Sequence, residues 1–429
     1  MRLDYDSRTM WTLSGVATRI AQGMGVHKDG TVLGLPPFET EMRRRLWWQI
    51  NLLDFKSAEL TGSAAFGFGE LNRWNTRLPA NVDDADIWPD MKDAPVEQTR
   101  PTEMIVCLLR YDAGVYWKEK LLQQSGAKDT GSHAMKEWFL TATMAERDEF
   151  IDELENRLEE KFLRYCDPSA PVQLLTSIIG RIMCKSMRIM AHHPRRYASE
   201  KDIPDSERRA LWETAIAVMD ADNLMHTYRA LQRFNWHTDV YFQHQALIII
   251  FSELRARPFG DGKDETWQKI DDLFKNHPDL LRDHRRPLNI AIGNLAMRAW
   301  EAREQAQSQD PQAAPWLDPP DFIQQLRRLK EKDQAKARAR QSEANQINLI
   351  SQAQGIELTV QPVRDDMSAL PSGQQVQTGN AFDAMLPHDF SMDMGDMGDL
   401  TMDWQRWDSL LNDFDVPTPS VPMMFQRPM

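Results

Sequence analysis

The chain has 429 residues, of which 41% are hydrophobic and 27% charged, and its formal net charge is -13. This length exceeds the usual size of one domain, and the composition fits a folded body that carries a polar extension. The longest fully aliphatic or aromatic run is only Ala246 to Phe251, and residues 1 to 9 lack the layout of a secretory signal. These features exclude a membrane-spanning protein and predict a soluble intracellular one with no membrane partner.

The negative charge is concentrated at one end of the chain. From Asp365 onward there are eleven aspartates and two arginines, so this stretch carries nine of the 13 net negative charges. The acidity therefore describes the tail and says little about the body.

Apolar residues recur at helical spacing through most of the body. A first amphipathic helix is predicted between Ser7 and Met24, and a second follows Pro36-Pro37 and ends near Gly62. Residues 62 to 101 are rich in Gly, Asn, Asp and Pro and are predicted to form an ordered loop system. Further helices are expected at 102–124, 135–165, 171–191, 206–232, 237–256, 264–276 and 284–305. No strand is predicted, so the fold class is all-α, a multi-helix domain with a disordered acidic C-terminal tail.

The run from Glu41 to Trp48, E-M-R-R-R-L-W-W, is the most distinctive stretch of the body. In a helix, Met42, Leu46, Ile50 and Leu53 would form one apolar face flanked by the arginines and Trp47. Guanidinium groups bind carboxylates and stack on indoles, so the run can serve as an internal clamp or as a phosphate or nucleic-acid surface. The clamp is the favoured interpretation.

Several motifs in the first 110 residues together resemble the regulatory middle region of fungal zinc-cluster transcription factors. The stretch Trp11 to Asp29 resembles the first core helix of that family and its Gly-aliphatic-His turn, and Glu41 to Asp54 resembles its arginine-tryptophan helix. Trp74 to Ile87 resembles the loop that follows, and Thr102 to Tyr111 the next helix. Weaker similarity extends the match to about residue 257.

The resemblance implies a regulatory domain in which the motif residues have structural roles. These residues are Trp11, Gly15, Gly25, His27, Glu41, Arg43, Arg44, Arg45, Trp47, Trp48, Asp54, Leu78 and Pro79. The loop is also similar to that of members that govern secondary-metabolite gene clusters.

The zinc module of this family needs six closely spaced cysteines, whereas this chain has three distant ones, Cys107, Cys166 and Cys184. They are expected to be buried free thiols, and no metal or other cofactor is predicted. DNA contact would then come only indirectly, through a partner, or through an N-terminal module missing from this version of the chain.

A basic segment follows the helical body. Arg327, Arg328, Lys330 and Lys332 begin a run that continues to Arg340, opposed only by Glu331 and Asp333. This pattern fits a nuclear import signal, which would place the protein in the nucleus. It fits a solvated face of a terminal helix equally well.

The acidic tail alternates aspartates with large apolar residues between Phe382 and Val416. Such a composition does not bury a core, but it keeps aromatic side chains available to a coactivator groove. An induced helix would carry Trp404, Trp407, Leu411 and Phe414 at spacings of three, four and three, with Leu410 beside them. The favoured reading is coactivator binding, and the alternative is a C-terminal helix that docks back onto the body.

Other candidate sites are weak. His192 and His193 are adjacent, so they point to different sides of a helix, and no carboxylate pattern accompanies them. His237 and His244, seven residues apart, are predicted to share a helix face and to cap or line a core groove, not to act in catalysis. Gly67 and Gly69 lack the later glycine of a phosphate-binding loop. No catalytic residues are predicted, and the protein is not expected to be an enzyme.

The sequence thus predicts four regions: a regulatory domain at 1–320, a basic helical segment at 321–341, a disordered linker at 342–380 and an activation-like tail at 381–429. The predicted function is regulation of RNA polymerase II genes in a fungus, with coactivators as partners of the tail. An adaptor or inhibitor that dimerises with an intact zinc-cluster factor is the main alternative, and a dimer with itself is open. A small-molecule-binding or enzymatic helical protein is the remaining alternative.

Overall fold

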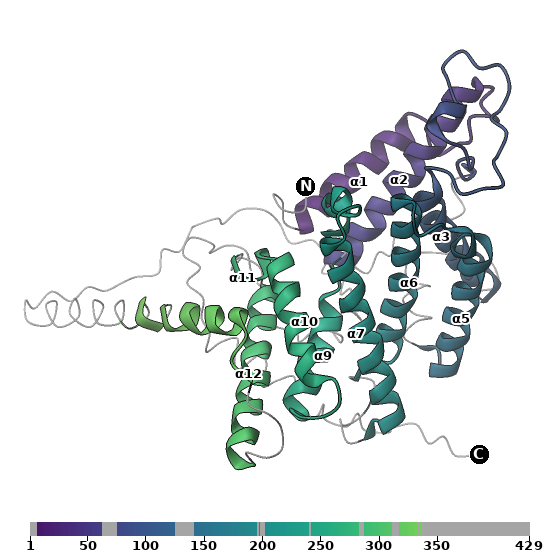
Figure 1. Ribbon diagram of the computed structural model, residues 1–429. Helices are drawn as coiled ribbons and strands as arrows, with labels where there is room; N and C mark the ends of the chain where they lie inside the picture. Colours follow the sequence, from purple (N-terminus) through teal and green to yellow (C-terminus); the bar gives the residue numbers. More distant parts are fainter. Residues whose placement is uncertain are drawn as a thin grey trace, which may run out of the picture. The chain divides into compact units, whose positions relative to one another are not determined.

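A computed structural model describes residues 7–61, 75–124, 141–194, 197, 202–239, 242–282, 287–310, 317–332, 334–336 and 338. All regular structure in these ranges is helical (Figure 1), which confirms the predicted all-α class. None of the helices in the described part is long and apolar enough to cross a membrane. The predicted linker and acidic tail lie outside the described residues.

The chain divides into two compact units, Met1–Glu253 and Leu254–Met429. The sequence predicted one body up to residue 320, and the bounds of the four predicted regions stay predictions. Each unit is described separately below.

The first unit begins with two long helices that pack side by side, α1 (Ser7–Gly23) and α2 (Pro37–Thr61). The turn between them depends on glycine. Gly25 has φ +72° and Gly34 has φ +69°, conformations that cost an L side chain energy and glycine none. Gly30 has a different role, because a Cβ there would lie 2.8 Å from the Thr40 Cα. The turn is therefore pressed directly against the first turn of α2.

A loop from 75 to 104 packs beside α2 and holds a short 3-10 helix, η1 (Asp84–Asp86). Asn81 organises it: its amide nitrogen donates to the carbonyls of Gln98 (2.7 Å) and Arg100 (3.0 Å), and its amide oxygen accepts from the Thr102 hydroxyl (2.7 Å). The first two bonds satisfy backbone carbonyls that no helix satisfies, and the third fixes the Asn81 side chain. The predicted ordered loop is therefore present from residue 75 onward.

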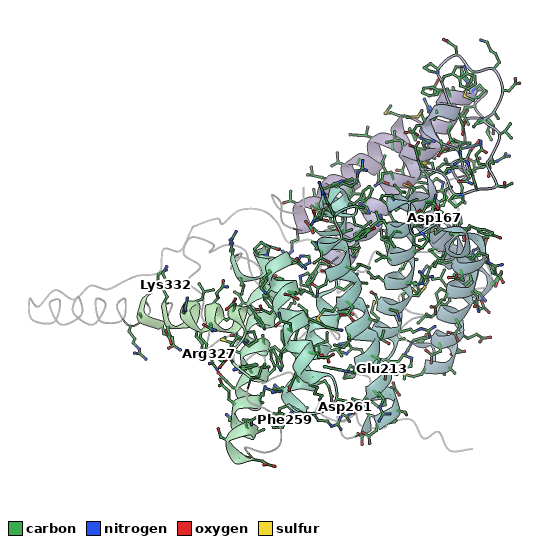
Figure 2. All side chains as sticks on the ribbon, viewed as in Figure 1. Asp167, Glu213, Phe259, Asp261, Arg327 and Lys332 are labelled. Carbon is green, nitrogen blue, oxygen red and sulfur yellow. The ribbon has the colours of Figure 1, made fainter. Side chains whose placement is uncertain are left out.

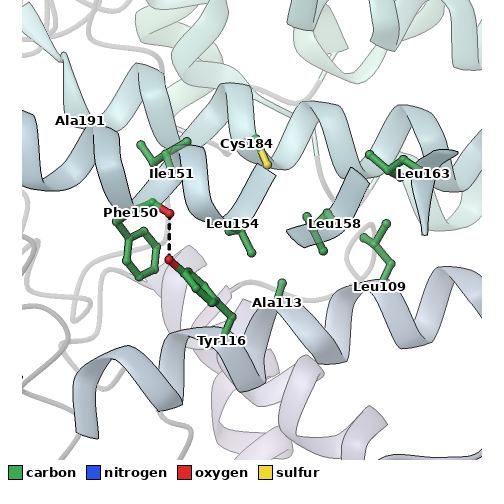
Figure 3. Packing of buried hydrophobic residues seen from close by; sticks show 10 residues of the cluster. All are labelled: Leu109, Ala113, Tyr116, Phe150, Ile151, Leu154, Leu158, Leu163, Cys184 and Ala191. Atoms are coloured by element: carbon green, nitrogen blue, oxygen red, sulfur yellow. Dashed lines mark hydrogen bonds between the residues drawn. The ribbon is translucent and has the colours of Figure 1, made fainter. Parts of the chain in front are cut away.

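Three helices form the next layer: α3 (Ile105–Gln124), α5 (Met144–Lys161) and α6 (Pro171–Ala191). A capping box between Thr143 and Glu146 starts α5, and Pro171 occupies the first turn of α6, where its missing N–H costs nothing. Their shared core is drawn in Figure 3, where the Tyr116 hydroxyl donates to the Phe150 carbonyl at 3.2 Å. Each fully buried leucine in this core contributes about 1.5–3 kcal/mol. The cluster consists of Leu109, Ala113, Tyr116, Phe150, Ile151, Leu154, Leu158, Leu163, Cys184 and Ala191.

Two long helices follow in the chain, α7 (Asp205–Thr227) and α9 (His244–Ala256), with the single-turn helix α8 (Asn235–Thr238) between them. α7 packs along α6. A second buried cluster joins α6, α7 and the turn after α7. It consists of Leu175, Ile178, Met225 and Leu231.

The second unit contains α10 (Lys263–Asn276), α11 (Asp279–Arg282), α12 (Pro287–Gln309) and a helical segment at 321–332. Its core is aromatic. Trp267 meets Trp300 edge to face at 4.9 Å, and Phe274 stacks on Phe322 at 4.3 Å, geometries that aromatic pairs favour. The Phe322 amide donates to the Asp271 carboxylate at 3.2 Å. Segment 321–332 is thereby attached to α10.

Candidate functional site

The arginine-tryptophan stretch lies in α2. Among its three arginines, Arg44 makes the most buried ion pair. Nε and Nη2 of Arg44 donate to the two oxygens of Asp29, at 2.8 and 2.9 Å. Asp29 is 1% exposed and also accepts the amides of Thr31 (3.1 Å) and Arg77 (3.0 Å). Burial alone would raise the pKa of this carboxyl, but the Arg44 pair and the other donors hold it well below its usual range. Asp29 therefore joins the turn after α1, helix α2 and the loop.

Arg45, the next residue, forms two further ion pairs. Its Nε donates to Glu41 at 3.1 Å, and its Nη1 donates to Asp84 at 2.6 Å. Glu41 is itself buried and accepts the Ala80 amide at 3.2 Å. The pair therefore fixes the loop against α2.

The two tryptophans form the buried side of α2. Trp48 donates through its indole N–H to the Arg77 carbonyl at 2.9 Å and lies 5.4 Å from the Tyr111 ring. Trp47 lies 6.1 Å from the His27 imidazole, so both indoles are enclosed by the turn, the loop and α3. Their surroundings include Ala21, Val26 and the half-buried Leu78.

Arg43 is the outermost of the three arginines. It pairs with Glu39 at 3.1 Å and donates to the Met24 carbonyl at 3.2 Å. All three guanidinium groups therefore bind groups of their own chain. The arrangement acts as an internal clamp, and the alternative of a phosphate surface finds no support in this geometry.

The remaining motif residues are placed on or beside α1 and the loop. Asp54 accepts the Ser14 hydroxyl at 2.7 Å, and burial raises its pKa. Pro79 is buried, and a Cβ added at Gly15 would lie 3.7 Å from the Arg19 guanidinium. Trp11 lies at the surface of α1, with 39% of the residue exposed.

His192 is the centre of a site that the sequence did not predict. Its Nε2 lies 2.7 Å from Asp148 on α5, and its Nδ1 lies 2.9 Å from Glu207 on α7. Burial lowers the pKa of this imidazole, but the two carboxylates outweigh that effect and raise it. Because the carboxylates occupy opposite sides of the ring, the group is an ion-paired bridge between helices and not a chelate.

His226 is bridged in a similar way. Its Nε2 lies 2.9 Å from Asp239, and its Nδ1 lies 2.9 Å from the Asp222 carbonyl. Burial again opposes the charge, yet the carboxylates of Asp239 and Asp222 raise the pKa to about 9.

The prediction that His237 and His244 share a helix face is wrong. His237 lies in the one-turn helix α8, and His244 begins α9 after a break in the helix. His237 Nε2 lies 2.9 Å from Arg110 Nη1, and burial together with that positive charge lowers its pKa to about 4. A neutral imidazole that accepts from Arg110 fits this environment.

The three cysteines are free thiols, as expected, but only Cys184 is fully buried. Burial raises the pKa of Cys184 to about 12 and also raises those of Cys107 and Cys166. All three are therefore thiols at neutral pH, and the form that binds metal is the thiolate.

The basic residues predicted for nuclear import lie on the 321–332 segment (Figure 2). Arg327 pairs with Glu304 of α12 at 2.7 Å. Arg328 and Lys332 are exposed and Lys330 is half-exposed. The predicted coactivator residues, Trp404 to Phe414, lie outside the described residues.

These contacts define a helical scaffold in which the arginine-tryptophan segment stabilises the fold. Comparison with known proteins agrees with the resemblance seen in the sequence. The fungal specific transcription factor domain matches residues 2–123. The chain therefore belongs to the family of proteins that carry this domain.

Two relatives of this chain are named as cluster transcription factors. The aurofusarin cluster transcription factor of Gibberella zeae is 34% identical over 299 residues, 70% of this chain and 43% of the relative. The pyriculol/pyriculariol biosynthesis cluster transcription factor 1 of Pyricularia oryzae is 30% identical over 348 residues, 78% of this chain and 44% of the relative. The chain thus spans less than half the length of these relatives. No solved structure matches.

Proposed function

We propose that this protein regulates transcription of RNA polymerase II genes in a secondary-metabolite gene cluster. The observation that carries the proposal is the similarity over about 70% of the chain to relatives named as cluster transcription factors. Fold alone would not support this function, since one fold hosts many activities. The support comes from the family and from the tail.

The acidic tail is the proposed activating segment. Trp404, Trp407, Leu411 and Phe414 recur at helical spacing, and Leu410 adjoins them. Aspartates between them keep the apolar side chains in water until a partner groove binds them as a helix. Transcriptional coactivators are the proposed partners.

The helical body is proposed to supply regulation and dimer contacts, with itself or with a zinc-cluster factor. We propose that this chain contacts DNA through such a partner, because its three cysteines lie far apart in the sequence and burial raises the pKa of each thiol. The site of action is the nucleus, and the basic residues from Arg327 to Lys332 are proposed to direct import. Arg328 and Lys332 are the most accessible of these.

A tethered reporter assay tests the activating role. The tail is fused to a heterologous DNA-binding domain, and Trp404→Ala with Trp407→Ala is expected to reduce reporter expression to background. Met423→Ala with Phe425→Ala, which lies beyond the helical stripe, is the matched control and is expected to leave activation intact. Equal activation by both variants would refute the role of the stripe.

A further inference from the structure

The outer surface of α1 and α2 carries large apolar side chains in solvent. Helix α1 has one row of them at spacings of three and four, and helix α2 has a second row. Their exposed fractions run from 37% to 61%, while Trp47 and Trp48 fill the core on the other side of α2. We call this surface the α1–α2 face; it consists of Leu13, Val16, Ile20 and Met24 on α1 and Met42, Leu46 and Leu53 on α2.

The two rows form one continuous surface because the helices pack antiparallel. Hydrogen bonds fix the register at both ends: Arg43 donates to the Met24 carbonyl, and the Ser14 hydroxyl donates to Asp54. The middle of the α1 row is thereby level with the middle of the α2 row. Each row is about 16 Å long and lies roughly a quarter turn from the seam between the helices. The opposite chain directions then place both rows on the same side of the pair.

The α1–α2 face is large enough for a specific interface. The exposed fractions of its seven side chains correspond to roughly 600 Å² of surface, so two copies joined through it would bury about 1,200 Å², the lower end of stable interfaces. An exposed apolar surface of this extent marks an interaction site. Because the two rows have the same length, a second copy of the face matches it in extent as well as in apolar character.

Charged residues at the two edges of the face decide how a second copy is oriented. The described helix α1 contains no carboxylate, and Arg8 and Arg19 lie on its edge away from α2. Along the opposite edge, Arg45 of α2 holds the loop through Asp84, whose side chain is 74% exposed. The short helix η1 and its cap contribute three aspartates to this loop. The face therefore has a basic edge along α1 and an acidic edge along α2.

We propose that the α1–α2 face joins two copies of this chain, with α1 of each copy lying over α2 of the other. A twofold axis parallel to the helices gives this arrangement, a four-helix bundle in which stacked neighbours are antiparallel. It sets the basic edge of each α1 beside the aspartates of the other copy. A twofold axis perpendicular to the helices would instead lay α1 over α1 and bring Arg8 and Arg19 toward their own equivalents, which like charge opposes. The inference rests on the proposed function, whose dimer contacts it assigns to a surface.

Sedimentation equilibrium of the full chain tests the dimer. Between about 1 and 50 µM, the average mass is expected to rise from the monomer mass of 49.7 kDa toward twice that value. Ile20→Asp with Leu46→Asp would bury unpaired charges at the contact and should weaken the dimer at least about a hundredfold. Leu224→Asp with Tyr165→Asp, at exposed apolar positions outside α1 and α2, is the matched control and should leave association unchanged. All four positions are exposed, so circular dichroism should show an unchanged fold.

Disulfide trapping tests the orientation of the two copies. Chains carrying Ile20→Cys are mixed with chains carrying Leu46→Cys and oxidised, and the joined peptides are identified by mass spectrometry. In the proposed arrangement Ile20 lies opposite Leu46 of the other copy, so the mixed product should exceed the product that joins two Ile20→Cys chains about tenfold. The unaltered chain, with its three native cysteines, is the control and should stay unjoined.

Three results would overturn the proposal: a chain that stays monomeric throughout this range, a dimer that Ile20→Asp with Leu46→Asp leaves intact, or trapping that joins two Ile20→Cys chains as readily as the mixed pair. Failure of the proposed function gives a different result. A dimer with the expected properties, found where deletion of the gene leaves transcripts unchanged, would reject the regulatory role and keep the interface. A monomeric chain whose deletion changes transcripts would do the reverse.

Discussion

Replacing Asp29 by Asn removes the charge that joins the turn after α1, helix α2 and the loop. Asp29 accepts both Arg44 nitrogens at 2.8 and 2.9 Å and two backbone amides. An asparagine keeps one acceptor oxygen but turns an NH₂ group toward these donors, and the Arg44 charge is left unpaired. Loss of one partner of a buried pair costs about 3–5 kcal/mol. Because the Arg44 side chain is 15% exposed and partly hydrated, we expect the lower end of this range.

Urea unfolding of the full chain, followed by tryptophan fluorescence, measures this effect. With a slope of about 2–3 kcal/mol per molar urea, a loss of about 3 kcal/mol lowers the unfolding midpoint by about 1 M. Glu39→Gln is the matched control: its partner Arg43 adjoins Arg44 on α2, but the pair lies at the surface, so the expected change is within about 0.5 kcal/mol. Equal unfolding midpoints for the two variants would refute the conclusion that Asp29 joins the turn, α2 and the loop.

The same variant has a predicted pH signature. The folded-state pKa of Asp29 is depressed, so its stabilisation is complete above its unfolded pKa of about 3.9 and is lost as the pH falls from there toward the folded value. Asp29→Asn should lack this acid-side loss. A wild-type and a variant curve of the same shape between pH 5 and 2 would contradict the reasoning.

Three further predictions concern stability. The pKa of His226 is raised to about 9, so its contribution is complete below about pH 6.5 and is lost as the pH rises through 9; His226→Gln should flatten the fall in the free energy of unfolding across this window. Gly30→Ala should destabilise by about 1–3 kcal/mol because its Cβ meets the Thr40 backbone, whereas Gly23→Ala, with nothing within 4 Å, should be neutral or stabilising in thermal unfolding. Leu154→Ala, at a fully buried position, should cost about 2–5 kcal/mol in the same assay, and a loss below 1 kcal/mol would contradict the packing shown in Figure 3.

Local signals in the sequence located the helices well. The prediction of 171–191 coincides with α6 because Pro171 starts the helix and Pro194 follows its end, and α10 matches its prediction within one residue. The break between α8 and α9 was missed, since the stretch contains no glycine or proline to signal it.

Contacts that depend on tertiary packing could not be predicted from the sequence. The partners of His192 come from Asp148 and Glu207, 44 and 15 residues away, and only the packing of α5 and α7 against α6 brings them together. Three members of the apolar row predicted on α2, Met42, Leu46 and Leu53, are exposed, whereas Ile50 packs against the core. Periodicity alone does not say which side of a helix is buried. Trp47 was expected to flank this row, whereas its large apolar side chain lies in the core together with that of Trp48.

Gene deletion in the source fungus, followed by sequencing of its RNA under metabolite-producing conditions, tests the central claim most directly. We expect transcripts of one contiguous set of biosynthetic genes to change together. The wild-type chain should restore them, whereas the chain carrying Trp404→Ala and Trp407→Ala should not. Transcript levels that are the same with and without the gene would contradict a role in transcription.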